Sequence, residues 1–138
     1  VATFTLPVDG TYFLRVENND GLAVRSGSAL LTVSDAPAWQ TAAGSLGSFA
    51  AGSSVGTITI TATDAVSFAV TSGSLPGGLT LNTAATNATI TGTESGATSA
   101  TTYNFTVTAT DAQGQTAARA FSIAITVGQQ YSMRFDGN

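Results

Sequence analysis

Two long runs near the C-terminal end alternate between apolar and small polar residues. Residues 103–110 read YNFTVTAT, and residues 121–127 read FSIAITV. A period of two places the apolar side chains of each run on one face of an extended strand and the polar ones on the other. Residues 111–114 (DAQG) lie between the runs and have turn composition, with a glycine free to adopt a positive φ. The two runs predict an antiparallel hairpin with one buried and one solvated face.

The composition favours an all-β chain without catalytic chemistry. Of the 138 residues, 43% are hydrophobic, which is sufficient for a core, and only 9% are charged, against roughly 25% in a typical soluble protein. The net charge of −4 and the absence of Lys leave no basic patch for nucleic acid or an anionic membrane surface. His and Cys are both absent, which excludes the common zinc sites, thiol chemistry and His-dependent triads. We expect a protein that is not an enzyme.

Turn signals about every ten residues divide residues 37–127 into the short strands of a β-sandwich. The candidate strands are residues 57–62, 66–71, 79–81, 88–91, 102–110 and 118–127, with a short first strand near Phe49 as the seventh. The alternation predicts a seven-stranded antiparallel sandwich. Its predicted core consists of Phe68, Val70, Tyr103, Phe105, Val107, Phe121, Ile123 and Ile125.

The segments on either side of this sandwich are too short to complete a domain. Residues 1–36 contain three or four alternating segments, which bury too little apolar surface for a confident independent fold. Pro37 marks the boundary, and we interpret Trp39 as a core or inter-domain anchor rather than a carbohydrate-stacking residue. Residues 128–138 begin with a linker and continue as one alternating strand. The chain starts VATF, without Met or a leader pattern, so we expect an internal piece of a longer protein.

Residues 10–21 (GTYFLRVENNDG) resemble the penultimate hairpin of the immunoglobulin-like domains shared by plexins and some transcription factors. The resemblance covers only the end of that domain. It implies that residues 1–36 are the C-terminal part of an immunoglobulin-like domain.

Residues 68–81 (FAVTSGSLPGGLTL), 90–93 (ITGT) and 103–111 (YNFTVTATD) resemble the family named "putative immunoglobulin (cadherin-like) domain", found in bacterial surface proteins and phage structural proteins. This resemblance covers residues 39–127 almost completely. Residues 132–138 (SMRFDGN) resemble the start of a concanavalin-type or laminin-G-like sandwich. The resemblances imply an all-β chain of tandem immunoglobulin-like sandwiches, one partial and one complete, followed by the first strand of a further domain.

Calcium is the one metal that the sequence leaves open as a cofactor. Cadherin-like modules bind Ca²⁺ through acidic oxygens at their junctions, and the candidates here are Asp35, Asp64 and Asp111. The paired acidic motifs of the cadherins are missing, so a turn-capping role is the favoured interpretation of Asp111. The glycine-rich residues 73–78 and 92–96 lack the spacing of phosphate-binding loops, and we interpret them as turns and strand edges. We therefore expect no catalytic residue and no cofactor.

The expected function is structural. The three resemblances in series, with Thr-, Ala- and Gly-rich surfaces, imply a spacer and interaction segment of a phage virion protein, such as a tail fibre, baseplate or capsid appendage at the virion surface. Its expected partners are other virion proteins, symmetry copies of itself, or a host surface glycan or protein, with no nucleic acid and no membrane insertion. The alternatives are a module of a bacterial cell-surface adhesin and a carbohydrate-binding segment of a secreted enzyme.

Overall fold

The computed structural model describes residues 10–17, 26–128 and 137, and these residues form ten strands and no helix. Contacts divide the chain into two compact units, residues 1–35 and 36–138. The all-β prediction is confirmed. The strands are β1 (Gly10–Glu17), β2 (Ser26–Val33), β3 (Ala38–Trp39), β4 (Gly44–Ala50), β5 (Ser54–Thr63), β6 (Ser67–Gly73), β7 (Leu79–Thr83), β8 (Asn87–Thr93), β9 (Thr101–Thr110) and β10 (Thr116–Thr126).

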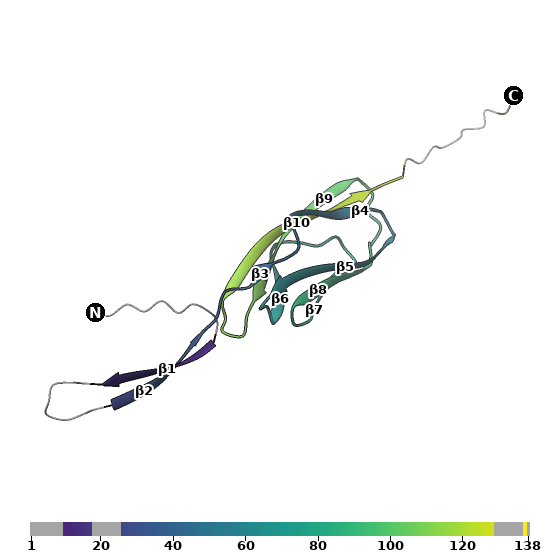
Figure 1. The fold of residues 1–138 in the computed structure, drawn as a ribbon. Coiled ribbons are helices and arrows are strands. Elements are labelled where there is room, and N and C mark those ends of the chain that lie inside the picture. The colour runs from purple at the N-terminus through teal and green to yellow at the C-terminus, as the bar shows by residue number, and fades with distance from the viewer. Residues whose placement is uncertain (1–9, 18–25, 129–136, 138) are drawn as a thin grey trace. The chain divides into compact units, whose positions relative to one another are not determined.

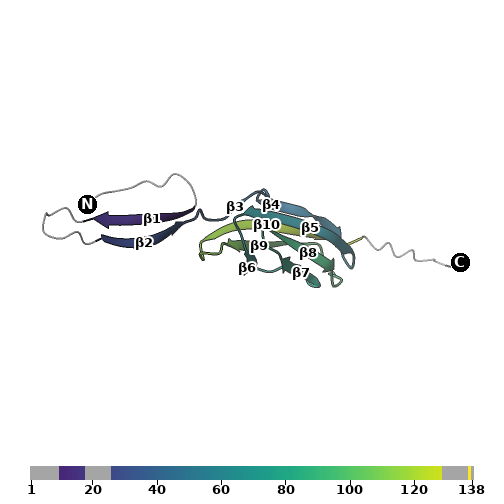
Figure 2. The same ribbon diagram turned by 60° about the horizontal axis from the view of Figure 1, so that its bottom comes forward.

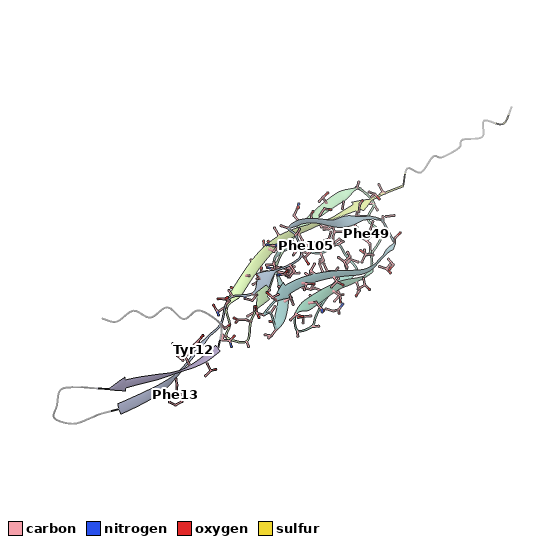
Figure 3. All side chains as sticks on the ribbon, viewed as in Figure 1. Tyr12, Phe13, Phe49 and Phe105 are labelled. Atoms are coloured by element: carbon pink, nitrogen blue, oxygen red, sulfur yellow. The ribbon has the colours of Figure 1, made fainter. Side chains whose placement is uncertain are left out.

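The described residues of the first unit form an antiparallel strand pair. Strands β1 and β2 pair in a continuous register from Gly10 opposite Val33 to Glu17 opposite Ser26. Phe13 is 76% exposed on this strand pair, and Figure 3 labels it beside Tyr12. Parts of the predicted alternating segments of residues 1–36, and the strand predicted to follow the linker that begins at residue 128, lie outside the described residues.

The second unit is a sandwich of two four-stranded sheets, visible as two layers in Figures 1 and 2. One sheet has the order β4-β10-β9-β6, and the other has the order β3-β5-β8-β7. All seven predicted strands are present, and β3 is an additional two-residue strand. The prediction that every pair is antiparallel is wrong, because β4 pairs in parallel with β10. The chain crosses from the sheet of β3 to the opposite sheet before β4 begins, and β4 then runs in the same direction as β10.

The core lies between the two sheets and is built by the alternation that the sequence shows. Every second side chain is buried from Phe105 to Ala109 on β9 and from Phe121 to Ile125 on β10, as the period of two requires. Six of the eight predicted core residues are buried. The other two are only half-buried and pack against the core: Val70 lies on the edge strand β6, and Tyr103 lies near the start of β9. The buried six are Phe68, Phe105, Val107, Phe121, Ile123 and Ile125.

Aromatic rings close one end of this core. The ring of Trp39 meets Phe68 and Phe121 edge-on, with ring centroids 5.7 and 5.4 Å apart. The centroids of Phe105 and Phe121 are 6.2 Å apart. Edge-to-face aromatic pairs contribute more to folding stability than the burial of their surface area alone would give. Figure 3 labels Phe49 and Phe105 in the sandwich.

Gly73 allows β6 and β9 to approach closely where β6 ends. Its φ is +70°, and a Cβ atom here would collide with the backbone carbonyl oxygen of Asn104 on β9. Both the dihedral and the contact require a residue without a side chain. The glycine-rich segment that begins at residue 73 therefore starts with a structural glycine.

Candidate functional site

Asp111 is buried in the turn between β9 and β10, where only 4% of its surface is exposed. Its carboxylate accepts hydrogen bonds from the backbone N–H groups of Gln113 and Gln115, at 2.9 and 2.7 Å. It also accepts one from the side-chain amide of Gln115, at 3.1 Å. These bonds give Asp111 the turn-capping geometry that its sequence position favours.

The other two calcium candidates are exposed residues. Asp64 occupies the short turn between β5 and β6 with a φ of 60°, and Asp35 lies at the end of the first unit. Across the described residues, no three acidic or metal-ligating side chains come together. A calcium ion takes six to eight oxygen ligands. The described geometry therefore adds no support for Ca²⁺ at Asp35, Asp64 or Asp111.

A second buried acidic side chain, Glu94, accepts hydrogen bonds from two loops of the sandwich, and it was not predicted from the sequence. Only 3% of its surface is exposed, in the loop between β8 and β9. Its carboxylate accepts hydrogen bonds from the backbone N–H groups of Gly52 (2.9 Å), Gly96 (2.8 Å) and Ala97 (3.1 Å to one oxygen and 3.2 Å to the other). Its own backbone N–H donates to the carbonyl oxygen of Ser53 at 3.0 Å. Glu94 thus ties the β4–β5 turn to the β8–β9 loop.

The hydrogen bonds to Glu94 stabilise its ionised form. The bond from Gly52 contributes most to lowering the pKa of this carboxyl below its ordinary value, followed by the bond from Ala97, and burial opposes them only in part. A weak signal was present in the sequence, since Glu94 is the only Glu between residues 36 and 127. It lies within residues 92–96, which we interpreted from their glycine content as a turn.

The chain enters the sandwich through a segment that is bound to both sheets. Trp39 belongs to β3, which pairs with β5, and its indole N–H donates to the carbonyl oxygen of Ala117 on β10 at 3.0 Å. The backbone N–H of Thr41 donates to the carbonyl oxygen of Thr61 on β5 at 3.2 Å. The guanidinium of Arg119 on β10 donates to the carbonyl oxygen of Thr41 at 2.7 Å. Trp39 is half-buried against the core, in agreement with its interpretation as an anchor.

The chain leaves the sandwich at the opposite end, which we call the exit end. Figures 1 and 2 both show β10 running from the region of β3, the entry end, to the point where the chain departs. Ala117 marks the entry end of β10, and Thr126 is its last residue. The nine residue-to-residue steps from Ala117 to Thr126 along an extended strand correspond to about 30 Å. The two connections of the sandwich are therefore separated by nearly the full length of its longest strand.

The outward face of β9 and β10 carries small side chains, because the buried residues occupy the alternate positions. The hydroxyl groups of Thr108 on β9 and Thr71 on β6 are 2.8 Å apart and share a hydrogen bond on this surface. The outward residues of the two strands, which we call the small-residue face, are Thr102, Asn104, Thr106, Thr108, Thr110, Thr116, Ala118, Ala120, Ser122, Ala124 and Thr126.

The sequence pattern of one family, described as "Putative Ig domain" (He_PIG), matches residues 32–126. The chain belongs to this family. The match includes every strand of the sandwich and confirms the immunoglobulin-like part of the resemblance. No curated protein matches the chain. The described residues include no helix able to cross a membrane.

Several solved structures align with this chain. An endo-fucoidan hydrolase of glycoside hydrolase family 107 aligns with a TM-score of 0.54 and 15% identity over 94% of this chain and 21% of the hydrolase. An Ig domain from the Titin M10–Obscurin like 1 complex aligns with a TM-score of 0.47 and 12% identity over 68% of this chain and 97% of that one. Mouse clustered PcdhgC3 EC1-3 aligns with a TM-score of 0.44 and 18% identity over 90% and 44%. The chain spans about a fifth of the hydrolase, and identities this low concern the fold alone.

Proposed function

We propose that this Ig domain is a structural spacer in a multidomain virion protein of a phage, at the virion surface, in a tail fibre, baseplate or capsid appendage. The observation that supports the proposal is the end-to-end path of the chain, from Trp39 at the entry end to Thr126 at the exit end. A domain connected in this way adds about 30 Å between its neighbours. In this proposal the segment acts mechanically, with no catalytic residue and no bound cofactor.

The small-residue face supports contact with other virion proteins or with symmetry copies of the same chain. Ordering Thr, Ser and Ala side chains in a contact costs less conformational entropy than ordering Lys or Arg. Thr106 and Ser122 are half-buried within this face. Replacing Thr106 with Lys is expected to reduce incorporation of the protein into particles while leaving the far-UV circular dichroism of the free chain unchanged. Normal incorporation of Thr106→Lys would contradict a packed role for this face.

The spacer proposal can be tested by duplicating residues 36–127 in the parent protein. Each added copy should lengthen the appendage by about 30 Å in electron micrographs, because entry and exit lie at opposite ends. A duplicated sandwich that leaves the length unchanged would contradict the proposal. Immunogold labelling of purified particles and of whole bacterial cells with an antibody to this chain separates the virion from the principal alternative, a module of a bacterial surface adhesin.

A carbohydrate-binding segment of a secreted enzyme is a second candidate, and the fold shared with an endo-fucoidan hydrolase favours it. Sugar-binding surfaces commonly use exposed aromatic rings, and Phe13 on β1 has one, with 76% of its surface exposed. Titrating the full chain with soluble fucoidan in a calorimeter tests this candidate. Saturable heat that Phe13→Ala abolishes would favour it over the spacer.

A further inference from the structure

A hollow of about 420 Å³ opens at the exit end of the sandwich, where the chain leaves β10. Its walls come from the β4–β5 turn, the β8–β9 loop and the residues directly after β10. This exit hollow is lined by Ala51, Ala97, Thr98, Val127 and Gly128. The lining carries no charged side chain, and Val127 has 36% of its surface exposed. Because burying a charged group without a partner is costly, the exit hollow suits an uncharged, largely apolar side chain.

Hydrogen bonds fix the three walls of the exit hollow relative to one another. The Glu94 carboxylate joins the β4–β5 turn to the β8–β9 loop, because it accepts hydrogen bonds from the backbone N–H groups of Gly52 and Ala97. The backbone N–H of Ala51 donates to the carbonyl oxygen of Thr126, the last residue of β10, at 2.8 Å. The exit hollow is therefore formed before a side chain enters it, and such preorganisation lowers the cost of binding.

The chain itself carries a side chain within reach of the exit hollow. Gly128, which lines the hollow, is followed by Gln129, Gln130 and Tyr131. These three lie outside the described residues, and Tyr131 is the first of them with a largely apolar side chain. Three residues span at most about 10 Å of extended chain. A tether this short gives the Tyr131 ring an effective concentration on the order of millimolar at the hollow, and a Tyr ring combines an apolar body with one polar tip.

We propose that the exit hollow is the docking site of the Tyr131 side chain, with its ring against Ala97 and Val127. Docking orders the two glutamines between Gly128 and Tyr131 and fixes the direction in which the chain leaves the sandwich. The inference goes beyond the spacer role, since a spacer sets the distance between its neighbours and the docked ring sets the direction of the part that follows. A domain could pass the duplication test without this contact, so the two proposals fail separately.

Nuclear magnetic resonance of the full natural chain provides the first test. The ring protons of Tyr131 should show nuclear Overhauser effects to the methyl groups of Ala97 and Val127. The backbone order parameter of Gln130 should be close to about 0.85, the value of a rigid backbone. The absence of these Overhauser effects would overturn the proposal. Overhauser effects that arise only between differently labelled copies in a mixed sample would also overturn it, because the occupant would then be a second copy.

Two alanines offer a matched pair of variants that separates docking from general stability. Ala97→Leu places a larger side chain in the exit hollow, whereas Ala84→Leu makes the same change in the exposed turn between β7 and β8. We expect Ala97→Leu to displace the ring and to lower the order parameter of Gln130 below about 0.6, the flexible range, whereas Ala84→Leu should leave it unchanged. A high order parameter in both variants would contradict docking in this hollow. The measurement on the natural chain remains decisive even if Ala97→Leu fails to fold.

Two buried carboxylates test whether the walls of the exit hollow must be held in place. Glu94 and Asp111 are 3% and 4% exposed, and each accepts several hydrogen bonds from backbone N–H groups. Glu94 joins two walls of the hollow, whereas Asp111 lies in the turn before β10. Glu94→Gln should weaken the Overhauser effects between the Tyr131 ring and Ala97, and Asp111→Asn should leave them unchanged, although both should lower the thermal midpoint. Equal weakening by the two variants would overturn the role of Glu94 as a positioning residue.

Discussion

Val107 and Val66 allow one substitution to be compared at a fully buried and at an open position of the same sandwich. Val107 on β9 has 0% of its surface exposed and lies opposite Val70, whereas Val66, between β5 and β6, is 51% exposed. Val→Ala removes two methyl-sized groups, and each is worth about 0.8 kcal/mol of transfer free energy when buried. The cavity left in a tightly packed core adds a comparable penalty. We expect Val107→Ala to lower the free energy of unfolding by about 2–3 kcal/mol.

The measurement is urea unfolding of the full chain, followed by the fluorescence of Trp39 and by far-UV circular dichroism. Trp39 is the only tryptophan and packs against the core, so its emission reports on the sandwich. Val66→Ala should change the free energy by no more than about 0.5 kcal/mol, as expected for a surface position. The thermal midpoint of Val107→Ala should fall by about 8 °C or more. If the two variants cost the same, Val107 is not packed between the sheets as described, and the core assignment fails.

Three further predictions follow from individual contacts. Gly73→Ala should lower the free energy of unfolding in urea by at least about 1 kcal/mol more than Gly56→Ala. Both glycines have a positive φ (70° and 67°), but of the two only Gly73 has no room for a Cβ atom. Equal losses would show that the backbone near Gly73 relaxes. The pKa of Glu94 is lowered in the folded state, so its stabilisation is complete above its ordinary value of 4.5 and is lost as the pH falls through the folded-state pKa. Glu94→Gln should therefore have a flatter stability profile in acid than the natural chain, and parallel profiles would contradict this. Trp39→Phe keeps the aromatic contacts but loses the hydrogen bond to the carbonyl oxygen of Ala117. The free energy of unfolding, measured by circular dichroism in urea, should fall by about 0.5–1.5 kcal/mol. An unchanged free energy would mean that water replaces this hydrogen bond.

The strands and most of the core could be predicted because burial between two sheets imposes a period of two on the sequence. Residues 103–110 show this period without interruption, and Phe105 and Val107 are buried as it requires. Trp39 was identified as an anchor because it is the only tryptophan and lies two residues after the boundary proline, Pro37. In these places the local sequence carries the structural information.

The parallel partner of β4 could not be predicted. Residues 44–50 (GSLGSFA) contain two glycines and no regular alternation, and their position depends on contacts with β10, more than 70 residues later. The role of Glu94 could not be predicted from the sequence for a similar reason. The partner that lowers its pKa most is the backbone N–H of Gly52, a group that every residue except proline carries and that the sequence cannot distinguish. Sites formed by backbone groups from distant loops leave little trace in side-chain patterns.

The pairing of β4 with β10 also bears on how the protein is made. Gly44 finds its partner, Phe121, only after nearly the whole domain has been synthesised, and such distant contacts slow folding. At about 5–20 residues per second, the ribosome needs several seconds to deliver β10 after β4. During this interval β4 lacks its only partner strand, and the last strand of another copy could pair with it instead. In a series of such domains, each would have to close around its own last strand before the next one emerged, so the order of synthesis itself would limit strand exchange between neighbours.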